Sequence, residues 1–144
     1  MKKLNNKGFS LVELIIVIAI MAILAAALAP QLIKYIEKSR ISSDKTSAAS
    51  VKTAFDTAIA NDDAYSEALA ASKVTCTTSS DVAADVSAPT LEAEMAKTLS
   101  DLKAPKSKKF SGQSYYVSWT VDDAGDGIGE IDFGIGSTSS DNIK

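Results

Sequence analysis

The pattern of apolar and polar positions divides the chain at residue 9. Residues 1–8, MKKLNNKG, are polar and carry three lysines, whereas the 21 residues that follow, FSLVELIIVIAIMAILAAALA, include a single charged side chain. As an α-helix, residues 9–29 would span about 31 Å, close to the roughly 30 Å hydrocarbon core of a bilayer. The pattern predicts one membrane crossing, with the lysines keeping residues 1–8 in the cytoplasm and the rest of the chain outside.

An ordinary secretory signal peptide is an alternative, because a basic start, an apolar run and the small residues Ala27-Leu28-Ala29 are all present. Three features count against it. The apolar run exceeds the roughly 7 to 15 residues of a signal core, an acidic residue has no role inside such a core, and Pro30 would directly follow the cleavage point.

The pattern beyond the apolar run is amphipathic. Pro30 lacks an N–H and crowds the preceding turn, so it should kink or loosen a helix that then continues to about Ala60. Apolar residues recur at helical spacing at Ile41, Ala48, Val51, Phe55, Ala58 and Ile59. We expect the remaining face to meet water or other subunits through the charged residues Lys38, Arg40, Asp44 and Lys45.

Polar residues 61–63, Asn-Asp-Asp, should end this helix, and residues 64–90 resemble a surface loop with a short helical turn at 65–71. A second helix is predicted over residues 89–102, with a core stripe of Leu91, Met95, Leu99 and Leu102. A basic loop follows, with Lys103, Lys106, Lys108 and Lys109. It is either solvated or makes contacts with an acidic neighbour or a polyanion.

Alternation marks two strands near the C-terminus. In residues 115–121, YYVSWTV, one face carries Tyr115, Val117, Trp119 and Val121, and residues 128–135 form the return strand. The predicted fold class is α+β, with a long N-terminal helix packed against a small antiparallel β-sheet.

The amino-acid composition excludes several kinds of functional site. The chain has no histidine and one cysteine, so a His/Cys metal site, a Ser/His/Asp triad and an intrachain disulfide are excluded. We therefore expect no enzyme activity and no cofactor, and Cys76 should be a small buried thiol. Removing Lys2, Lys3 and Lys7 leaves 12 basic and 18 acidic side chains, a side-chain charge of −6. This acidic balance does not suggest nucleic-acid binding.

Asp122, Asp123 and Asp126 cluster with glycines between the two strands and are a weak calcium candidate. An EF-hand loop starting at Asp122 would have Ala124 and Phe133 at its third and twelfth positions, so key oxygen ligands are missing. An acidic hairpin turn is the preferred interpretation.

Glu13 is the informative residue of the apolar run. An unpaired carboxylate at mid-membrane costs about 2.5 kcal/mol or more. Between Lys7 and Lys34 the sequence offers no cation. The partner is Lys7 itself, another chain, or a charge created later; cleavage before Phe9 would create an α-amino group four residues ahead of Glu13. Alternatively, Glu13 could extend towards the cytoplasmic interface near Lys7.

The segment Lys7-Gly8-Phe9-Ser10-Leu11-Val12-Glu13-Leu14, followed by about twenty apolar residues, resembles the type III leader and N-terminal helix of type IV pilins. The resemblance implies that a membrane-embedded prepilin peptidase cuts after Gly8 and methylates the amine of Phe9. It implies that Glu13 then pairs with the N-terminus of a neighbouring subunit. Many pilins have two cysteines, and the single cysteine here fits sparse-cysteine pilins of Gram-positive bacteria.

The resemblance divides the chain into a leader, residues 1–8, a transmembrane and filament-core helix, residues 9–30, and a globular headgroup, residues 31–144. It implies a single-pass protein of the cytoplasmic membrane that becomes part of an extracellular helical filament of identical subunits. An inner-membrane assembly platform and its ATPase are the implied partners. A pseudopilin or competence-type pilin shares the same N-terminal features. A monomeric, membrane-anchored binding domain is an alternative of another class.

Overall fold

A computed structural model describes residues 9–136 of the chain. The chain forms two compact units, Met1–Glu37 and Lys38–Lys144. Gly8 and Lys7, which belong to the predicted cleavage motif, lie outside the described residues.

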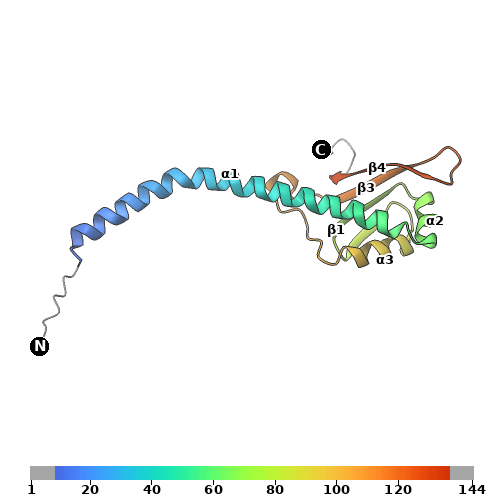
Figure 1. Ribbon diagram of the computed structural model, residues 1–144, viewed down its shortest axis with the longest axis horizontal. Coiled ribbons are helices and arrows are strands. Elements are labelled where there is room, and N and C mark those ends of the chain that lie inside the picture. Colours follow the sequence, from blue (N-terminus) through green and yellow to red (C-terminus); the bar gives the residue numbers. More distant parts are fainter. Residues whose placement is uncertain (1–8, 137–144) are drawn as a thin grey trace, which may run out of the picture. The chain divides into compact units, whose positions relative to one another are not determined.

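The helix α1 spans Leu11–Ala58 and begins in the first unit and ends in the second (Figure 1). It is helical through Pro30, which confirms that the helix continues beyond this residue. The segment contains no glycine and is rich in leucine and alanine, which are strong helix formers. The kink expected at Pro30 stays a prediction.

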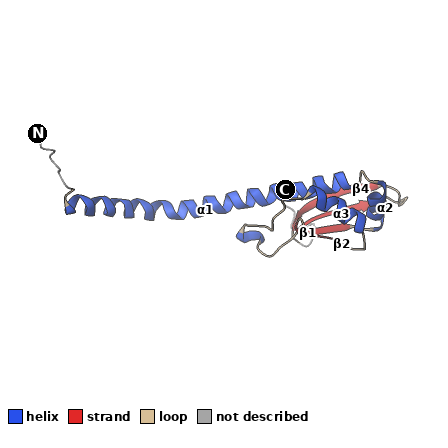
Figure 2. Cartoon of the chain, turned by 90° about the horizontal axis from the view of Figure 1, so that it is seen from below, coloured by secondary structure: helices blue, strands red, loops and turns tan. Residues whose placement is uncertain are grey.

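The second unit contains the end of α1 and a four-stranded antiparallel sheet with strand order β2-β1-β3-β4 (Figure 2). The elements after α1 are α2 (Asp62–Ala70), β1 (Lys73–Thr78), β2 (Asp81–Ala84), α3 (Pro89–Thr98), the 3-10 turn η1 (Lys108–Phe110), β3 (Tyr115–Val121) and β4 (Ile128–Ile135). The α+β fold with a long helix and a small antiparallel sheet is confirmed.

The interpretation of residues 64–90 as a surface loop is wrong beyond its helical turn. The turn is present as α2, where the Asn61 side chain caps the helix by accepting from the amides of Asp63 and Ala64. The loop that was expected next contains β1 and β2. These strands are short and built from small side chains, so they carry little alternation of their own. Pairing with β3, for example Val74 opposite Val117, makes β1 an inner strand.

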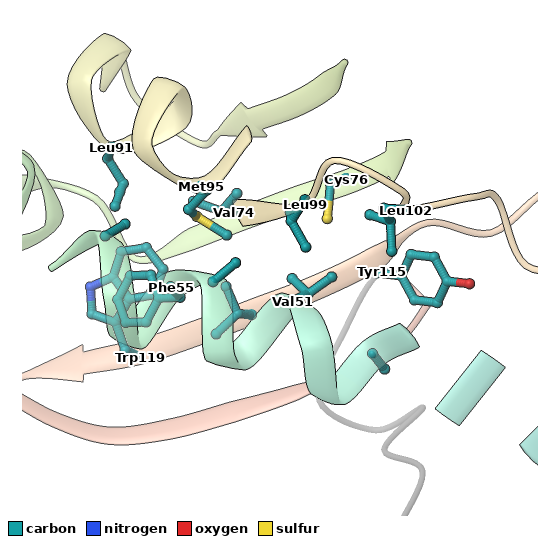
Figure 3. Packing of buried hydrophobic residues seen from close by; sticks show 14 of the residues in the cluster. Val51, Phe55, Val74, Cys76, Leu91, Met95, Leu99, Leu102, Tyr115 and Trp119 are labelled. Carbon is teal, nitrogen blue, oxygen red and sulfur yellow. The ribbon is translucent and has the colours of Figure 1, made fainter. Parts of the chain in front are cut away.

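The core lies between α1, α3 and the sheet, as predicted. Phe55 of α1 is buried and stacks on Trp119 of β3, with ring centroids 4.2 Å apart (Figure 3). The indole N–H of Trp119 donates to the carbonyl of Ala68 at 2.9 Å, so the polar atom of the largest core side chain is satisfied. The predicted stripe of α3 and the residues after it is buried: Leu91, Met95, Leu99 and Leu102.

The expectation that Asp44 faces water or another subunit is wrong. Asp44 is 2% exposed, and its two carboxylate oxygens accept from the backbone amides of Lys106 at 2.9 Å and Ser107 at 2.8 Å. A buried carboxylate is tolerated where it is hydrogen-bonded, and two amide donors meet this requirement. Asp44 thereby ties the loop after α3 to α1. Lys38, Arg40 and Lys45 are exposed, as expected.

Tyr116 lies on the opposite face of β3 from Tyr115 and Val117, yet it is fully buried too. Its cross-strand partner is Gly134, and a Cβ added to that glycine would lie 3.1 Å from the Tyr116 ring. The tyrosine ring therefore covers the gap that a glycine leaves in a strand. Its hydroxyl donates to Asp132 at 3.4 Å. Alternation predicted the face of Tyr116 but not its burial.

Candidate functional site

The start of α1 holds the predicted processing and assembly residues that the structure describes. Phe9 is 87% exposed and precedes the helix, and Ser10 is the residue directly before its first turn. The carboxylate of Glu13 accepts the backbone amide of Ser10 at 2.9 Å. Ser10 precedes the helix and Glu13 is its third residue, so this bond is the one that the glutamate makes in a capping box.

The capping role of Glu13 could have been found in the sequence. Ser10-Leu11-Val12-Glu13 matches the capping-box signature, a serine or threonine followed three residues later by glutamate or glutamine. Glu13 is also the acidic residue of the first turn, where the helix dipole favours a negative charge. The carboxylate therefore stabilises its own helix, in addition to any role towards another chain.

The first half of α1, up to residue 33, is an exposed and largely apolar surface. An 18-residue window of α1 has a mean hydropathy of 3.0 and no buried residue, which makes α1 long and apolar enough to cross a membrane. Sixteen of its large apolar side chains are exposed, from Leu11, Val12 and Leu14 through Leu32, Ile33, Tyr35 and Ile36. A continuous apolar surface of this size marks a membrane or protein contact.

Glu13 is the only charged side chain between residues 9 and 33. Up to residue 33 the helix therefore presents a single carboxylate, in its first turn, and an otherwise apolar or small-residue surface. When such a helix enters lipid or packs among other helices, a cation that meets this carboxylate fixes the relative position of the two chains, because any other position leaves a charge unpaired.

The turn between β3 and β4 uses its carboxylates to hold its own backbone. Asp122 accepts the amide of Asp126 at 3.1 Å, and its main-chain N–H donates to the carbonyl of Gly127 at 2.9 Å. A hydrogen bond from the Gly127 amide is the largest cause of the lowered pKa of Asp122. Across residues 9–136, no group of three His, Cys, Asp or Glu side chains could hold a metal ion, so Asp122, Asp123 and Asp126 do not converge on one point.

Cys76 is buried as predicted, with 1% of its surface exposed, at the centre of β1. Burial is the main cause that raises its pKa to about 12, and the charge of Asp81 adds to it. The thiol is therefore protonated and inaccessible in the folded chain.

Comparison with known proteins shows what the start of the chain is similar to. Residues 3–29 match the family described as the prokaryotic N-terminal methylation motif. The chain is 42% identical over 63 residues to the type IV major pilin protein PilA of Myxococcus xanthus, and 44% identical over 59 residues to the type IV major fimbrial protein FimA of Dichelobacter nodosus. These matches cover 44% and 41% of this chain but only 29% and 37% of those two proteins.

A longer match exists. The chain is 31% identical over 116 residues to the prepilin peptidase-dependent protein A of Clostridium perfringens, which covers 80% of this chain and 79% of that protein. No solved structure matches the chain significantly.

Proposed function

Because the chain belongs to the type IV pilin family, we propose that it is a structural subunit that is cut after Gly8, N-methylated at Phe9 and polymerised through its N-terminal helix. The observation that carries the proposal is the helix itself. From residue 9 to residue 33 it is exposed, largely apolar and marked by one carboxylate, and it overlaps with the matched methylation motif of residues 3–29. Before assembly the segment serves as a single membrane crossing, and after assembly as the filament core.

In this proposal Glu13 has two functions. Its carboxylate caps its own helix through the amide of Ser10. During assembly it pairs with the α-amino group of Phe9 in a neighbouring subunit, a charge that exists only after cleavage. Before cleavage the basic leader precedes the helix; after it, each subunit carries one cation and one anion at the start of α1. The pair selects a single register, because any other register leaves both charges unpaired among apolar side chains.

The proposed partners follow from this cycle. A prepilin peptidase removes residues 1–8, an inner-membrane platform with its ATPase moves the subunit out of the membrane, and other copies of the chain receive it. The name of the clostridial relative, which describes dependence on a prepilin peptidase, supports the first of these partners.

Mass spectrometry of the mature N-terminus tests the processing step. The expected result is a chain that begins at a methylated Phe9. A mature chain that begins at Pro30, or an intact Met1, would refute the proposal and favour a released or anchored monomer.

A pair of substitutions at Glu13 tests the assembly step and separates its two functions. Glutamine also accepts the capping hydrogen bond but carries no charge. If pairing drives assembly, Glu13→Gln and Glu13→Ala both leave a processed subunit in the membrane and both abolish filaments. Normal filaments from Glu13→Gln, with loss only in Glu13→Ala, would assign Glu13 to capping alone and overturn the pairing role.

A further inference from the structure

Two surfaces of the second unit each carry charge of one sign. Residues 102–121 contain four lysines and no acidic residue, whereas residues 110–143 contain neither lysine nor arginine. We call residues 103–110 the basic loop; its lysines are Lys103, Lys106, Lys108 and Lys109, and all four are exposed. We call a second set the acidic end; it comprises Asp62 and Asp63 at the start of α2 and Asp122, Asp123 and Asp126 in the β3–β4 turn, all exposed.

The basic loop is held in place at three points. Asp44 accepts the amides of Lys106 and Ser107, the Tyr115 hydroxyl donates to the carbonyl of Lys103 at 3.1 Å, and Phe110 is buried. The backbone of the loop is thus fixed to α1 and β3, while its four lysines are exposed. A charged surface fixed in this way loses little conformational freedom when it binds.

The acidic end is preorganised too. The hydroxyl of Tyr65 in α2 donates to the carbonyl of Asp126 at 3.1 Å and joins the helix to the β3–β4 turn. The turn is closed internally by the bond from the Asp126 amide to Asp122. Two acidic segments about sixty residues apart in the sequence are therefore held next to each other.

The two charged surfaces lie at opposite ends of this unit. β3 leads from the basic loop to the acidic turn, and its seven residues span about 23 Å. α1 rises about 21 Å from Asp44, which holds the loop, to Ala58, just before α2. Figure 2 shows η1 at one end of the sheet and α2 at the other. This separation exceeds the Debye length of about 8 Å at physiological salt, so the two surfaces do not neutralise each other within one chain.

We propose that the basic loop of one copy of this chain docks against the acidic end of another copy. The proposal rests on the proposed filament and names a contact between its headgroups. The contact joins two different surfaces, so it is heterologous, and a heterologous contact that does not close into a ring generates a helical polymer. With a side-chain charge of −6 after processing, copies repel each other overall, and this pair of surfaces provides a local attraction that selects the docking orientation.

Zero-length carbodiimide cross-linking of sheared wild-type filaments, followed by mass spectrometry, tests the contact directly. The reagent joins an amine to a carboxylate only where the two touch. Because the surfaces lie more than about 20 Å apart within one copy, any product that links residues 103–109 to residues 62–63 or 122–126 must join two copies. We expect such products. Their absence, while other lysines in the same filaments do cross-link, would overturn the proposal.

Charge reversal provides a second test in the full chain. Lys103→Glu with Lys106→Glu should lower the yield of sheared filaments about tenfold, because the four positive charges of the loop become two positive and two negative ones and its attraction to the acidic end is lost. The matched control, Lys103→Arg with Lys106→Arg, should keep the wild-type yield. Adding Asp123→Lys and Asp126→Lys to this double-glutamate chain should restore filaments, since the two introduced glutamates can then pair with the two introduced lysines of the next copy.

Each outcome separates this inference from the proposed function. If the wild-type chain forms no filaments, the proposed function fails. If wild-type and reversed chains form filaments equally well, only the docking proposal fails. If reversal leaves the filament yield unchanged but removes retention of filaments on immobilised double-stranded DNA, the basic loop binds a polyanion and the docking proposal is overturned.

Discussion

Removing the Asp44 carboxylate should loosen the loop that it ties to α1. The loop amides of Lys106 and Ser107 donate to its two oxygens. These bonds join residues that are 62 and 63 positions apart in the sequence, so they hold the loop to a distant helix. Asp44→Ala deletes both acceptors. Asp44→Asn keeps the size of the side chain and one acceptor oxygen, but it turns an amide group towards the second donor.

The expected loss follows from the burial of the two donors. Ser107 is 1% exposed, so its unpaired amide carries a desolvation cost of about 1–3 kcal/mol. Lys106 is exposed, and its amide regains water at a cost of roughly 1 kcal/mol. Asp44→Ala should therefore lower the free energy of unfolding by about 2–4 kcal/mol, and Asp44→Asn by about 1–3 kcal/mol, because one charge-assisted bond remains as a neutral one.

The assay is urea unfolding of the processed chain in detergent micelles, followed by tryptophan fluorescence. Trp119 is the single tryptophan and stacks in the core, so its emission reports on the second unit alone. Ser43→Ala is the matched control, since Ser43 is the exposed neighbour of Asp44 on the same helix. If Asp44→Ala unfolds within about 0.5 kcal/mol of Ser43→Ala, the range expected of a surface substitution, the carboxylate does not hold the loop.

Three further predictions concern the same unit. Phe55→Ala should cost about 3–5 kcal/mol because it removes the stack on Trp119 and leaves a cavity, with a smaller loss for Phe55→Leu; equal losses in urea unfolding would contradict this. The Cys76 thiol, with a pKa of about 12, should react with a maleimide at pH 8 far more slowly in the folded chain than in urea, and equal rates would show that it is accessible. Glu67 accepts the amides of Leu91 and Thr90, and the Leu91 bond is the main cause of its lowered pKa. The stability that the Glu67 carboxylate contributes is complete above the unfolded pKa of about 4.3 and is lost as the pH falls through the lower pKa of the folded chain. Glu67→Gln should therefore flatten the decline of the urea midpoint from pH 6 to pH 3. An unchanged decline would refute this role of Glu67.

Local signals predicted the helices well because each helix carries its own period. The stripe through Ala48, Val51, Phe55 and Ala58 repeats at intervals of three and four, and these residues are buried. Whether a strand could be predicted depended on how strongly large apolar and polar side chains alternate along it. β3 alternates large aromatic and aliphatic side chains and was found, whereas β1, with Val74 and Cys76 as its buried positions, gives a pattern that a loop can also show.

The candidate site shows the same division. The abrupt polar-to-apolar boundary at residue 9 and the lone carboxylate at Glu13 are visible in sequence, and the capping role of Glu13 is also encoded locally, in the spacing of Ser10 and Glu13. The four lysines of the basic loop are evident in the sequence. The attachment of the loop to α1 could not be predicted, because Asp44, which accepts its amides, lies about sixty residues earlier.

The sequence by itself determined the long helix, its exposed apolar half, its amphipathic half and the acidic, cysteine-poor character of the chain, since each depends on neighbours within a few residues. Tertiary structure decided that Asp44 is buried, that β1 and β2 complete the sheet and that the basic loop and the acidic end lie apart in the second unit. The physical reason is that a carboxylate prefers water and is buried only where folding supplies hydrogen-bond donors to it. Its environment is set by the partner that folding brings to it, here from about sixty residues away for Asp44.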